Sequence, residues 1–244
     1  VGTSVGSLIG ACYVQNDVES AIEMWLQMET DTIFDICSDP SGIDYFREFI
    51  RHGGASSAPL RQELDVYMDE EKIRKSPIGY GLVTTEFPSM NPKYLWKEDI
   101  PHGKLLDFMA ASCAAFPAIH MYQIDGINYI DGAYANNLPV FMAREKGAKF
   151  IIAVEIDRKD SDKVEPGSAD ETYLLIRPQF DLGFMLNFQI ENTKRAMILG
   201  YLDALKAFKL LDGVKYTFKR GEFEENELIQ LDYLCDILGV IPTE

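Results

Sequence analysis

The sequence predicts a layered α/β fold, in which helices cover both sides of a largely parallel central sheet. The first observation behind this prediction is that strand-like segments alternate with amphipathic helical segments along the chain. The second is the segment 149–157, whose nearly continuous apolar residues are typical of a strand buried on both faces. The third is size: the 244 residues, 47% of them hydrophobic, suffice for a single domain, 1–244, with a substantial core.

Four amphipathic helices are predicted in the first part of the chain, over residues 4–15, 16–28, 41–54 and 57–68. Their apolar stripes are formed by Val5, Leu8, Ile9 and Cys12 in the first, by Ile22, Trp25 and Leu26 in the second, and by Ile43, Phe46, Phe49 and Ile50 in the third. Asn16 and Glu19 predict a capping box at the start of the second helix. Ser57 and Pro59 predict the cap and the first turn of the fourth.

Strands and helices alternate from residue 78 onward. Strand composition marks residues 78–87, 127–132, 149–157, 172–178 and 215–219. Helical composition marks residues 104–117, 138–148, 190–211 and 226–238, and the stripe of the longest one is formed by Met197, Tyr201, Leu205 and Phe208. Residues 90–100 are interpreted as a loop or edge segment, and residues 158–171 as an exposed loop.

The chain is strongly acidic, with a formal net charge of -16 at pH 7 and a pI of about 4.6. This charge argues against a nucleic-acid partner, which requires clustered lysine and arginine. It also argues against strong docking on anionic lipid, although transient contact with a membrane surface through an apolar patch stays open. No apolar run approaches transmembrane length, and no signal segment opens the chain. We therefore expect a cytoplasmic protein, whose oligomeric state the sequence leaves open.

Four cysteines are widely spread along the chain, at Cys12, Cys37, Cys113 and Cys235. Because they lack Cys-x-x-Cys spacing, they indicate neither a zinc site nor a dense disulfide framework. We interpret them as buried or semi-buried thiols in a reducing compartment. Carboxylates at the spacing of a calcium-binding loop are also missing from the sequence, so neither a metal nor another cofactor is expected.

The segment Gly2-Thr3-Ser4-Val5-Gly6 fits the pattern Gly-x-Ser-x-Gly. A serine on a sharp strand-to-helix turn occupies strained backbone, and neighbours without Cβ let the strand and helix close around it. The N-terminus of the following helix would favour negative charge on a substrate oxygen. The motif alone is weak, and the alternative is a glycine-rich loop in which Ser4 caps the helix.

A nucleophilic serine needs a base, and the histidines offer no late triad partner. The three histidines are His52, His102 and His120, and none follows residue 120. In α/β-hydrolases the histidine comes last along the chain, after the serine and the acid. His52 follows a helix, His102 sits in a Pro-Gly turn, and His120 is interpreted as structural. Either a base of another type acts here, or the chain is not an enzyme.

The segment 129–140 supplies a candidate base. A predicted strand ends in Asp131-Gly132-Ala133, and a helix is predicted to follow, with Asn136 and Asn137 at its cap and Pro139 in its first turn. An aspartate at the end of a parallel strand lies where α/β sheets bind their ligands. The alternative is that Asp131 only braces a turn, which is common for aspartate before glycine.

Together, Gly2–Gly6, the segment 110–119 (AASCAAFPAI) and the segment 129–140 resemble the patatin-like phospholipase family. The stretch ENTKRAMILGYLDA is also similar to the C-terminal helix of bacterial members, so the resemblance extends to about residue 210. That family uses a Ser–Asp dyad, which implies that Ser4 is the nucleophile and Asp131 the general base. The motif positions Gly2, Gly6, Gly132 and Ala133 match its two turns.

The resemblance also implies a glycine-rich loop before the serine, whose backbone N–H groups help to form the oxyanion hole. This chain begins at the serine turn, so we expect it to be truncated and to lack its N-terminal strand and that loop. Of the expected oxyanion donors only the N–H of Val5 remains. The loss of one such donor in other hydrolases lowers the rate by about 10²–10³-fold.

The resemblance implies a serine acyl-ester hydrolase of lipid metabolism, that is a lysophospholipase, phospholipase A or lipid acyl hydrolase. An acyl groove is one interpretation of a Pro-broken aromatic segment, and edge packing is the other, for Phe87, Met90, Tyr94, Leu95 and Trp96. Two alternatives remain. One is a catalytically impaired patatin-like domain that binds lipid or protein, and the other is an unrelated α/β binding domain with a chance motif.

Overall fold

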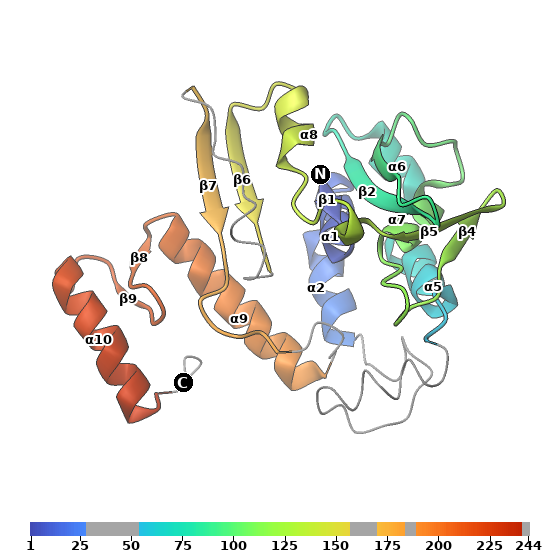
Figure 1. Cartoon of the computed structure of the whole chain (residues 1–244). Helices are drawn as coiled ribbons and strands as arrows, with labels where there is room; N and C mark the ends of the chain where they lie inside the picture. Colours follow the sequence, from blue (N-terminus) through green and yellow to red (C-terminus); the bar gives the residue numbers. More distant parts are fainter. Residues whose placement is uncertain (28–53, 157–169, 184–188, 241–244) are drawn as a thin grey trace. The chain divides into compact units, whose positions relative to one another are not determined.

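The computed structural model describes residues 1–27, 54–156, 170–183 and 189–240 (Figure 1). The predicted helix over residues 41–54 and most of the predicted loop over 158–171 lie outside these ranges. The chain divides into two compact units, Val1–Ala148 and Lys149–Glu244. Each unit is described by itself.

The first unit contains a five-stranded mixed sheet. Its strands are β1 (Gly2–Thr3), β2 (Gly81–Phe87), β3 (Pro92–Trp96), β4 (Tyr122–Ile124) and β5 (Ile127–Asp131). The order is β1-β2-β5-β4, and β3 also pairs with β2. β1 runs parallel to β2, whereas β3 and β5 run antiparallel to it and β4 antiparallel to β5. The layered α/β class is therefore confirmed, but the prediction of a largely parallel sheet is wrong for this unit, where only the β1–β2 pair is parallel. The segment 90–100, predicted as a loop or edge segment, contains the edge strand β3.

Helices pack on this sheet and on one another. They are α1 (Val5–Val14), α2 (Val18–Gln27), α5 (Ala58–Tyr67), α6 (Glu70–Lys75), α7 (Leu105–Ser112), the 3₁₀ turn η1 (Gly132–Tyr134) and α8 (Val140–Glu145). α7 contacts β2, β4, β5 and α5, and α1 contacts β1, α2 and α7. β1 leads directly into α1 through a one-residue turn (Figure 1).

The core is centred on β2, whose first five residues are all buried. Leu82 and Val83 are completely covered, as are Leu105 and Met109 of α7. The buried hydroxyl of Thr84 donates to the backbone oxygen of Ile130, so its polarity is satisfied. Because β2 is paired on both edges and covered on both faces, it forms the centre of the unit. The neighbouring strands β1, β3 and β5 are hydrogen-bonded to it.

The apolar stripes of the first two helices differ in part from the prediction. In α1 Leu8 and Cys12 are buried as predicted, but Ile9 is 42% exposed. In α2 the predicted stripe is wrong by one position, because Ala21 and Met24 are buried while Ile22 is 43% exposed. Periodicity shows that a helix is amphipathic, but a short helix leaves the exact phase of its buried face open.

The caps also shift slightly. The predicted Asn16–Glu19 capping box is wrong: Asp17 accepts the N–H of Ser20, while Asn16 has a φ of 61° and forms the turn between the helices. Such a left-handed backbone is tolerated by asparagine. Ser57 is the N-cap residue of α5 with a proline in the first turn, as predicted.

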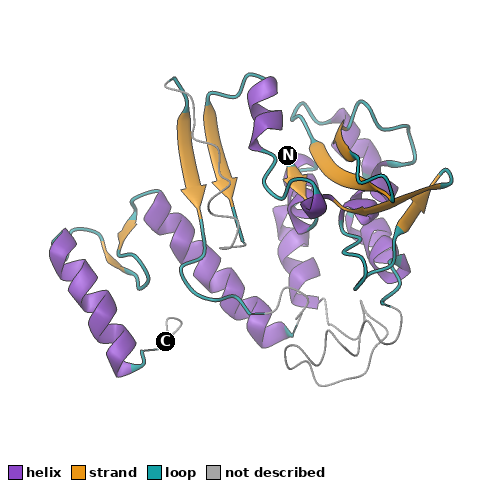
Figure 2. Ribbon diagram, in the orientation of Figure 1, coloured by secondary structure: helices purple, strands orange, loops and turns teal. Residues whose placement is uncertain are grey.

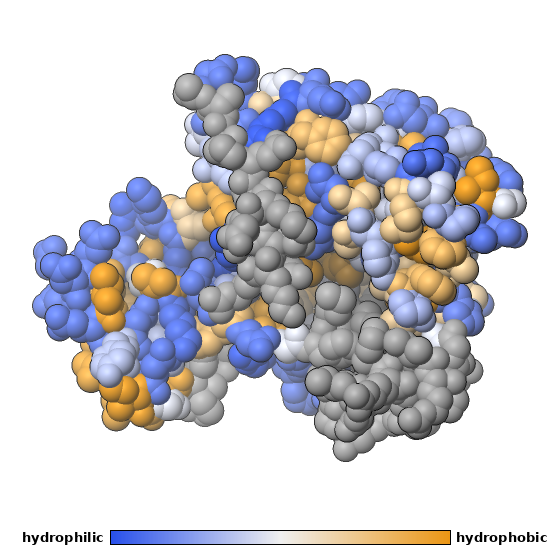
Figure 3. Space-filling view, viewed as in Figure 1, coloured by the Kyte–Doolittle hydropathy of each residue, from blue (hydrophilic) through white to orange (hydrophobic). Residues whose placement is uncertain are grey.

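The second unit is built on two parallel strands, β6 (Phe150–Val154) and β7 (Thr172–Ile176), which Figure 2 shows together with the long helix α9 (Ile190–Ala207). A short antiparallel pair follows, β8 (Leu211–Asp212) with β9 (Phe218–Lys219), and then α10 (Glu225–Leu238). α10 buries none of its side chains, and its apolar residues are visible in orange at the lower left of Figure 3.

Two burial predictions for this unit are wrong. β6 is a strand, but it is not buried on both faces: Ile151 and Ala153 are buried, whereas Phe150 is 58% and Val154 59% exposed. In α9 the buried residues are Leu199 and Asp203 instead of the predicted stripe through Tyr201. The buried carboxylate is satisfied by Lys206, whose Nζ lies 2.9 Å away. An apolar run shows what a strand can bury, while the neighbouring elements decide what is covered.

Within the described ranges, no helix combines the length and the hydropathy that a membrane span requires.

Candidate active site

Ser4 occupies the predicted strand-to-helix turn. β1 ends at Thr3 and α1 begins at Val5, so the whole turn is one residue long. The backbone of Ser4 has a φ of 53° and a ψ of -130°, a conformation that residues other than glycine rarely adopt. Its side chain makes no capping hydrogen bond to α1, which contradicts the alternative that Ser4 is an ordinary helix cap. The hydroxyl of Ser4 is thus not used by the helix that follows it.

The two glycines of the motif contribute differently. A Cβ at Gly2 would lie 2.3 Å from the backbone oxygen of Gly6 and 2.7 Å from the nitrogen of Ser7, so only glycine lets α1 fold back onto β1. A Cβ at Gly6 would meet nothing within 4 Å. The expectation that both glycines allow close approach is therefore correct for Gly2 and wrong for Gly6.

Asp131 ends β5, which lies on the same edge of β2 as β1, because β3 occupies the other edge. In the ladders Thr3 pairs with Val83, and Asp131 pairs with Thr84, the next residue of β2. The expectation that Asp131 ends a parallel strand is wrong, because β5 is antiparallel to β2. The two segments instead approach the same point of β2 from opposite directions, which brings Ser4 and Asp131 together.

Asp131 is 4% exposed, and one carboxylate oxygen accepts the N–H of Ala133 at 2.8 Å. Burial raises the pKa of Asp131 from 3.8 to about 6, and hydrogen bonding from Ser4 and from Ala133 lowers it in part. Burial disfavours the ionised carboxylate because it loses hydration, while the two donors favour it. The alternative that Asp131 braces its own turn is thus confirmed, since one carboxylate oxygen accepts the N–H of Ala133. The carboxylate also interacts with Ser4.

The Ser4 hydroxyl acts on the Asp131 carboxylate as a hydrogen-bond donor, and this interaction lowers the pKa of Asp131. Hydrogen bonds between a nucleophile and its base often tighten further when substrate is bound.

The sequence reasoning did not single out Ser112 and Cys113, which adjoin this pair. Ser112 Oγ accepts the backbone N–H of Ser4 at 2.9 Å. Burial and then the charge of Asp131 raise the pKa of the Cys113 thiol, while the hydroxyls of Ser4 and Ser7 act in the opposite direction. The signal that could have found both is the small-residue run 110–119. Cys12 and Cys113 are buried free thiols and Cys235 is partly buried, as predicted, while Cys37 lies outside the described residues.

Val5 is the first residue of α1, so its N–H has no partner within the helix. This N–H lies at the N-terminus of α1, where the partial positive charge of the helix favours an anion. The role of Val5 as an oxyanion donor stays a prediction.

The turn after Asp131 is tied to the serine turn. Thr3 Oγ1 donates to the backbone oxygen of Asn136 at 2.8 Å, and Asn136 in turn accepts the N–H of Leu138. α8 begins two residues later than predicted, and its N-cap residue is Pro139 instead of the predicted asparagine. The turn predicted from Asn136, Asn137 and Pro139 is therefore present, but the proline precedes the first helical turn.

Comparisons with known proteins agree with this geometry. The profile described as "Patatin-like phospholipase" matches residues 1–144, which nearly coincide with the first compact unit. The chain belongs to the patatin-like phospholipase family. It is 22% identical over 170 residues to Lysophospholipase NTE1 of Debaryomyces hansenii, which covers 65% of this chain and 10% of that protein. It is 25% identical over 164 residues to Patatin-like phospholipase domain-containing protein 6 of Homo sapiens and of Mus musculus, covering 65% of this chain and 11% of each. The chain thus spans about a tenth of the length of these curated relatives.

Of the two histidines that the structure describes in this patatin-like chain, neither is a cause of the pKa shift of Asp131. His102 is exposed in a turn, 3.8 Å from Glu71. His120 lies beside Gly54, and its backbone N–H donates to Ala55. His52 lies outside the described residues.

The aromatic segment after β2 mostly packs internally. Tyr94 meets Phe141 of α8 edge to face, with ring centroids 4.7 Å apart. Lys146 lies over the ring of Trp96, with 4.6 Å between its Nζ and the ring centroid. These contacts favour edge packing over an acyl groove for Tyr94 and Trp96.

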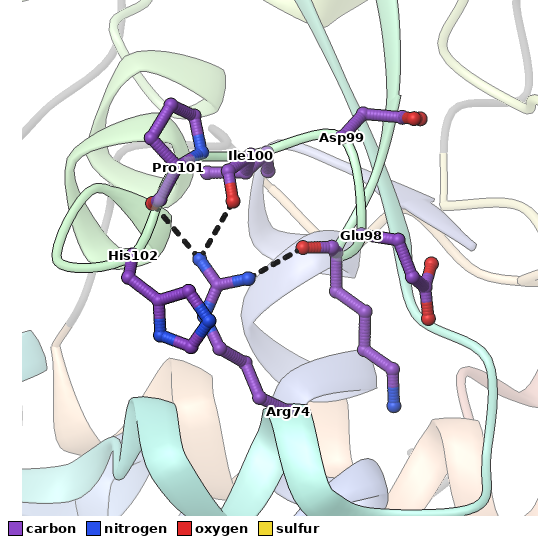
Figure 4. Close-up of a pocket in the computed structure, with 7 residues that line it drawn as sticks. Arg74, Glu98, Asp99, Ile100, Pro101 and His102 are labelled. Atoms are coloured by element: carbon purple, nitrogen blue, oxygen red, sulfur yellow. Dashed lines mark hydrogen bonds between the residues drawn. The ribbon is translucent and has the colours of Figure 1, made fainter.

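A surface hollow of about 500 Å³ beside α6 is separate from the Ser–Asp pair (Figure 4). The guanidinium of Arg74 points into the loop that lines it and donates to the backbone oxygens of Lys97, Ile100 and Pro101. A further bond joins Arg74 to Glu70. Its donors therefore hold the loop in place. The ammonium of Lys97, which also lines the hollow, donates to the backbone oxygens of Ile73, Ser76 and Ile78. No cluster of metal-binding side chains occurs in the part of the chain that the structure describes.

Proposed function

We propose that this patatin-like chain is a serine acyl-ester hydrolase in which Ser4 is the nucleophile and Asp131 the general base. The observation that carries the proposal is the strained backbone of Ser4 beside a buried carboxylate whose pKa is raised to about 6. Strained residues and shifted carboxylates both concentrate at functional sites. Their coincidence at one point of β2 is difficult to explain by stability alone, since each lowers it.

The proposed reaction has two halves. Asp131 accepts the hydroxyl proton of Ser4 while Ser4 Oγ bonds to the ester carbonyl carbon, and the N–H of Val5 faces the oxyanion. The tetrahedral intermediate collapses, the acyl–oxygen bond breaks, and the proton passes from Asp131 to the leaving alcohol. Water then attacks the acyl-enzyme and gives a proton to Asp131. When this second intermediate collapses, the bond between Ser4 Oγ and the acyl carbon breaks, Asp131 returns the proton to Ser4 Oγ, and the carboxylic acid is released. None of these steps uses a metal or a cofactor.

The raised pKa is what makes an aspartate usable here. A carboxylate with the ordinary pKa of about 3.9 is a weak base at neutral pH. At about 6 it is mostly ionised at pH 7 and yet holds a proton more readily.

For the substrate we propose a fatty-acyl ester: a lysophospholipid, a phospholipid or a neutral lipid. The family and the word lysophospholipase in the name of one relative support this class. The acidic charge and the free thiols support a cytoplasmic location. Transient contact with a lipid surface is part of the same proposal.

The direct test replaces Ser4 with alanine and measures hydrolysis of p-nitrophenyl esters of graded chain length in the full natural protein. We expect a loss of at least about 10³-fold in kcat/KM, because removing a serine nucleophile has effects of this order or larger. Labelling by an organophosphonate probe should disappear together with activity.

The matched control is Ser89→Ala, which removes an exposed hydroxyl that donates to Glu86. This variant should keep wild-type activity and labelling. Hydrolysis that survives Ser4→Ala would refute the mechanism. If the natural protein neither hydrolyses any of the esters nor reacts with the probe, the lipid- or protein-binding alternative is favoured instead.

The pH profile tests the base. Because Asp131 must be ionised to accept the proton, kcat/KM should be constant above about pH 7 and fall as pH drops through about 6, approaching tenfold per pH unit. The profile is to be measured from about pH 4.5 to 8, with circular dichroism confirming the fold at each pH. A flat profile down to the lower limit would exclude Asp131 with its raised pKa as the base.

A further inference from the structure

We propose that Ser112 is a positioning residue that holds the backbone of Ser4 in its strained conformation by tying it to β2. The inference concerns the same site and rests on the proposed function. Ser112 is the last residue of α7 and is completely buried. The proposed role of Ser112 involves no contact with substrate or with Ser4 Oγ. It acts through the backbone of Ser4.

The hydroxyl of Ser112 makes two hydrogen bonds whose directions are forced. It accepts the backbone N–H of Ser4 at 2.9 Å and donates its own proton to the backbone oxygen of Val83 at 2.7 Å. A backbone N–H cannot accept and a carbonyl oxygen cannot donate, so only one orientation of the hydroxyl satisfies both. Ser112 is therefore a fixed link between the serine turn and the central strand.

Ser4 needs such a link because its backbone lies outside both neighbouring elements. β1 ends before it and α1 begins after it, so neither the ladder nor the helix binds its N–H. A buried backbone N–H requires a partner, and a strained conformation persists only when its surroundings hold it. Within the described residues, Ser112 Oγ is the partner recorded for this N–H.

The other end of Ser4 is held redundantly. Its backbone oxygen accepts both the hydroxyl of Ser7, at 2.6 Å, and the N–H of Ser7, at 2.8 Å. Loss of the Ser7 hydroxyl leaves the backbone bond in place. Loss of the Ser112 hydroxyl leaves the N–H of Ser4 without its partner, so the two serines should differ in importance.

The same short segment also holds the aspartate. Two residues after Ser112, the backbone oxygen of Ala114 accepts the N–H of Asp131 at 2.8 Å. The Val83 oxygen to which Ser112 is tied is also where Gly132 approaches β2, since a Cβ on Gly132 would lie 2.2 Å from it. The end of α7 thus fixes Ser4 and Asp131 relative to one strand, and so relative to each other.

The sequence around Ser112 agrees with a specific use of the hydroxyl. Its neighbours Ala110, Ala111 and Ala114 are small, apolar and completely buried. If the side chain of Ser112 only filled space, alanine would serve equally well. A buried hydroxyl destabilises the fold unless it is hydrogen-bonded.

The test compares Ser112→Ala with Ser7→Ala and with Tyr80→Phe. Tyr80 donates a buried hydroxyl to the backbone oxygen of Ser7, so its loss removes a comparable bond from the same helix without touching Ser4. We expect Ser112→Ala to lower kcat and the rate of organophosphonate labelling by about 10²-fold with KM little changed, because small misplacement of a nucleophile has effects of this size. Ser7→Ala and Tyr80→Phe should change both by less than about threefold, since the strained turn remains tied.

The pH profile supplies a readout that a purely structural role would not move. If Ser4 shifts away, Asp131 loses the hydroxyl that lowers its pKa. The acid limb of kcat/KM should then move to higher pH in Ser112→Ala and stay in place in Tyr80→Phe. An unchanged limb together with an unchanged labelling rate would overturn the inference.

Hydrogen exchange tests the inference independently of catalysis. In the unsubstituted protein the Ser4 amide should exchange at least about tenfold more slowly than the amide of Val5, and this protection should vanish in Ser112→Ala. Equal exchange at the two amides would refute the link even if the variant fails to fold. If the natural protein is not labelled at all, the proposed function fails, while the protection of Ser4 still decides whether Ser112 holds the turn.

Discussion

Replacing Asp131 with asparagine is expected to abolish ester hydrolysis and at the same time to stabilise the folded protein at neutral pH. Loss of a general base lowers rates by about 10²–10⁴-fold, and asparagine cannot accept the serine proton. Asparagine can still accept the N–H of Ala133, so the turn stays braced. The two effects have the same origin, which is the burial of a carboxylate that must ionise to work.

The sign of the stability effect follows from the direction of the pKa shift. The pKa of Asp131 is about 6 in the folded chain, whereas an unfolded chain has the ordinary value of about 3.9. Below about pH 4 the group is neutral in both states, and the full stability is present. As pH rises through about 6 the unfolded state is favoured by its easier ionisation, by up to about 3 kcal/mol for a shift of roughly two pKa units.

Asp131→Asn should therefore raise the free energy of unfolding by about 1–3 kcal/mol at pH 7 and by little at pH 4. Urea unfolding at both pH values measures this, with Asp125→Asn as the control. Asp125 forms only an exposed ion pair with Lys104, so its replacement should change stability by less than about 1 kcal/mol. A loss of stability in Asp131→Asn at pH 7, or retained hydrolysis, would contradict the assignment.

Gly132→Ala and Gly2→Ala are expected to destabilise the fold by about 3 kcal/mol or more, near or beyond the upper end of typical overpacking effects. The new Cβ at Gly132 would lie 2.2 Å from the oxygen of Val83 and 2.9 Å from Cγ2 of Thr3. The new Cβ at Gly2 would lie 2.3 Å from the oxygen of Gly6. In both positions the main obstacle is backbone, which cannot rotate away as a side chain can.

The matched control is Gly10→Ala, in α1. Its Cβ would meet only the Tyr80 ring at 3.7 Å, an ordinary contact. Alanine has a higher helix propensity than glycine by about 0.5–1 kcal/mol, so this variant should be as stable as the wild type or more so. The midpoints of denaturant unfolding at fixed pH give all three values. If Gly132→Ala or Gly2→Ala unfolds at the wild-type midpoint, the close packing of the two turns is refuted.

Much of the fold, and the choice of Ser4 and Asp131 as candidate site residues, could be derived from short patterns. The Gly2–Gly6 turn, the Asp131–Gly132 turn and the succession of strands and helices depend on local backbone preferences. The family followed from the same segments, and the match over residues 1–144 confirms it. Several predictions that failed concern buried faces: the phase of α2, the cover of β6 and the buried side of α9. Others concern the cap of α2, the direction of β5 and the close approach at Gly6.

The sequence by itself determined which residues are chemically suited to the reaction, because a serine between small residues, an aspartate before glycine and the lack of a late histidine can all be read along the chain. Only the tertiary structure decided how they are arranged. It joined Ser4 to Ser112, 108 positions away, and placed Asp131 on an antiparallel strand where burial raises its pKa to about 6. The physical reason is that turn and helix preferences act over only a few residues of the chain. Burial, steric contact and hydrogen-bond partners depend instead on which distant segments lie along the same side of β2.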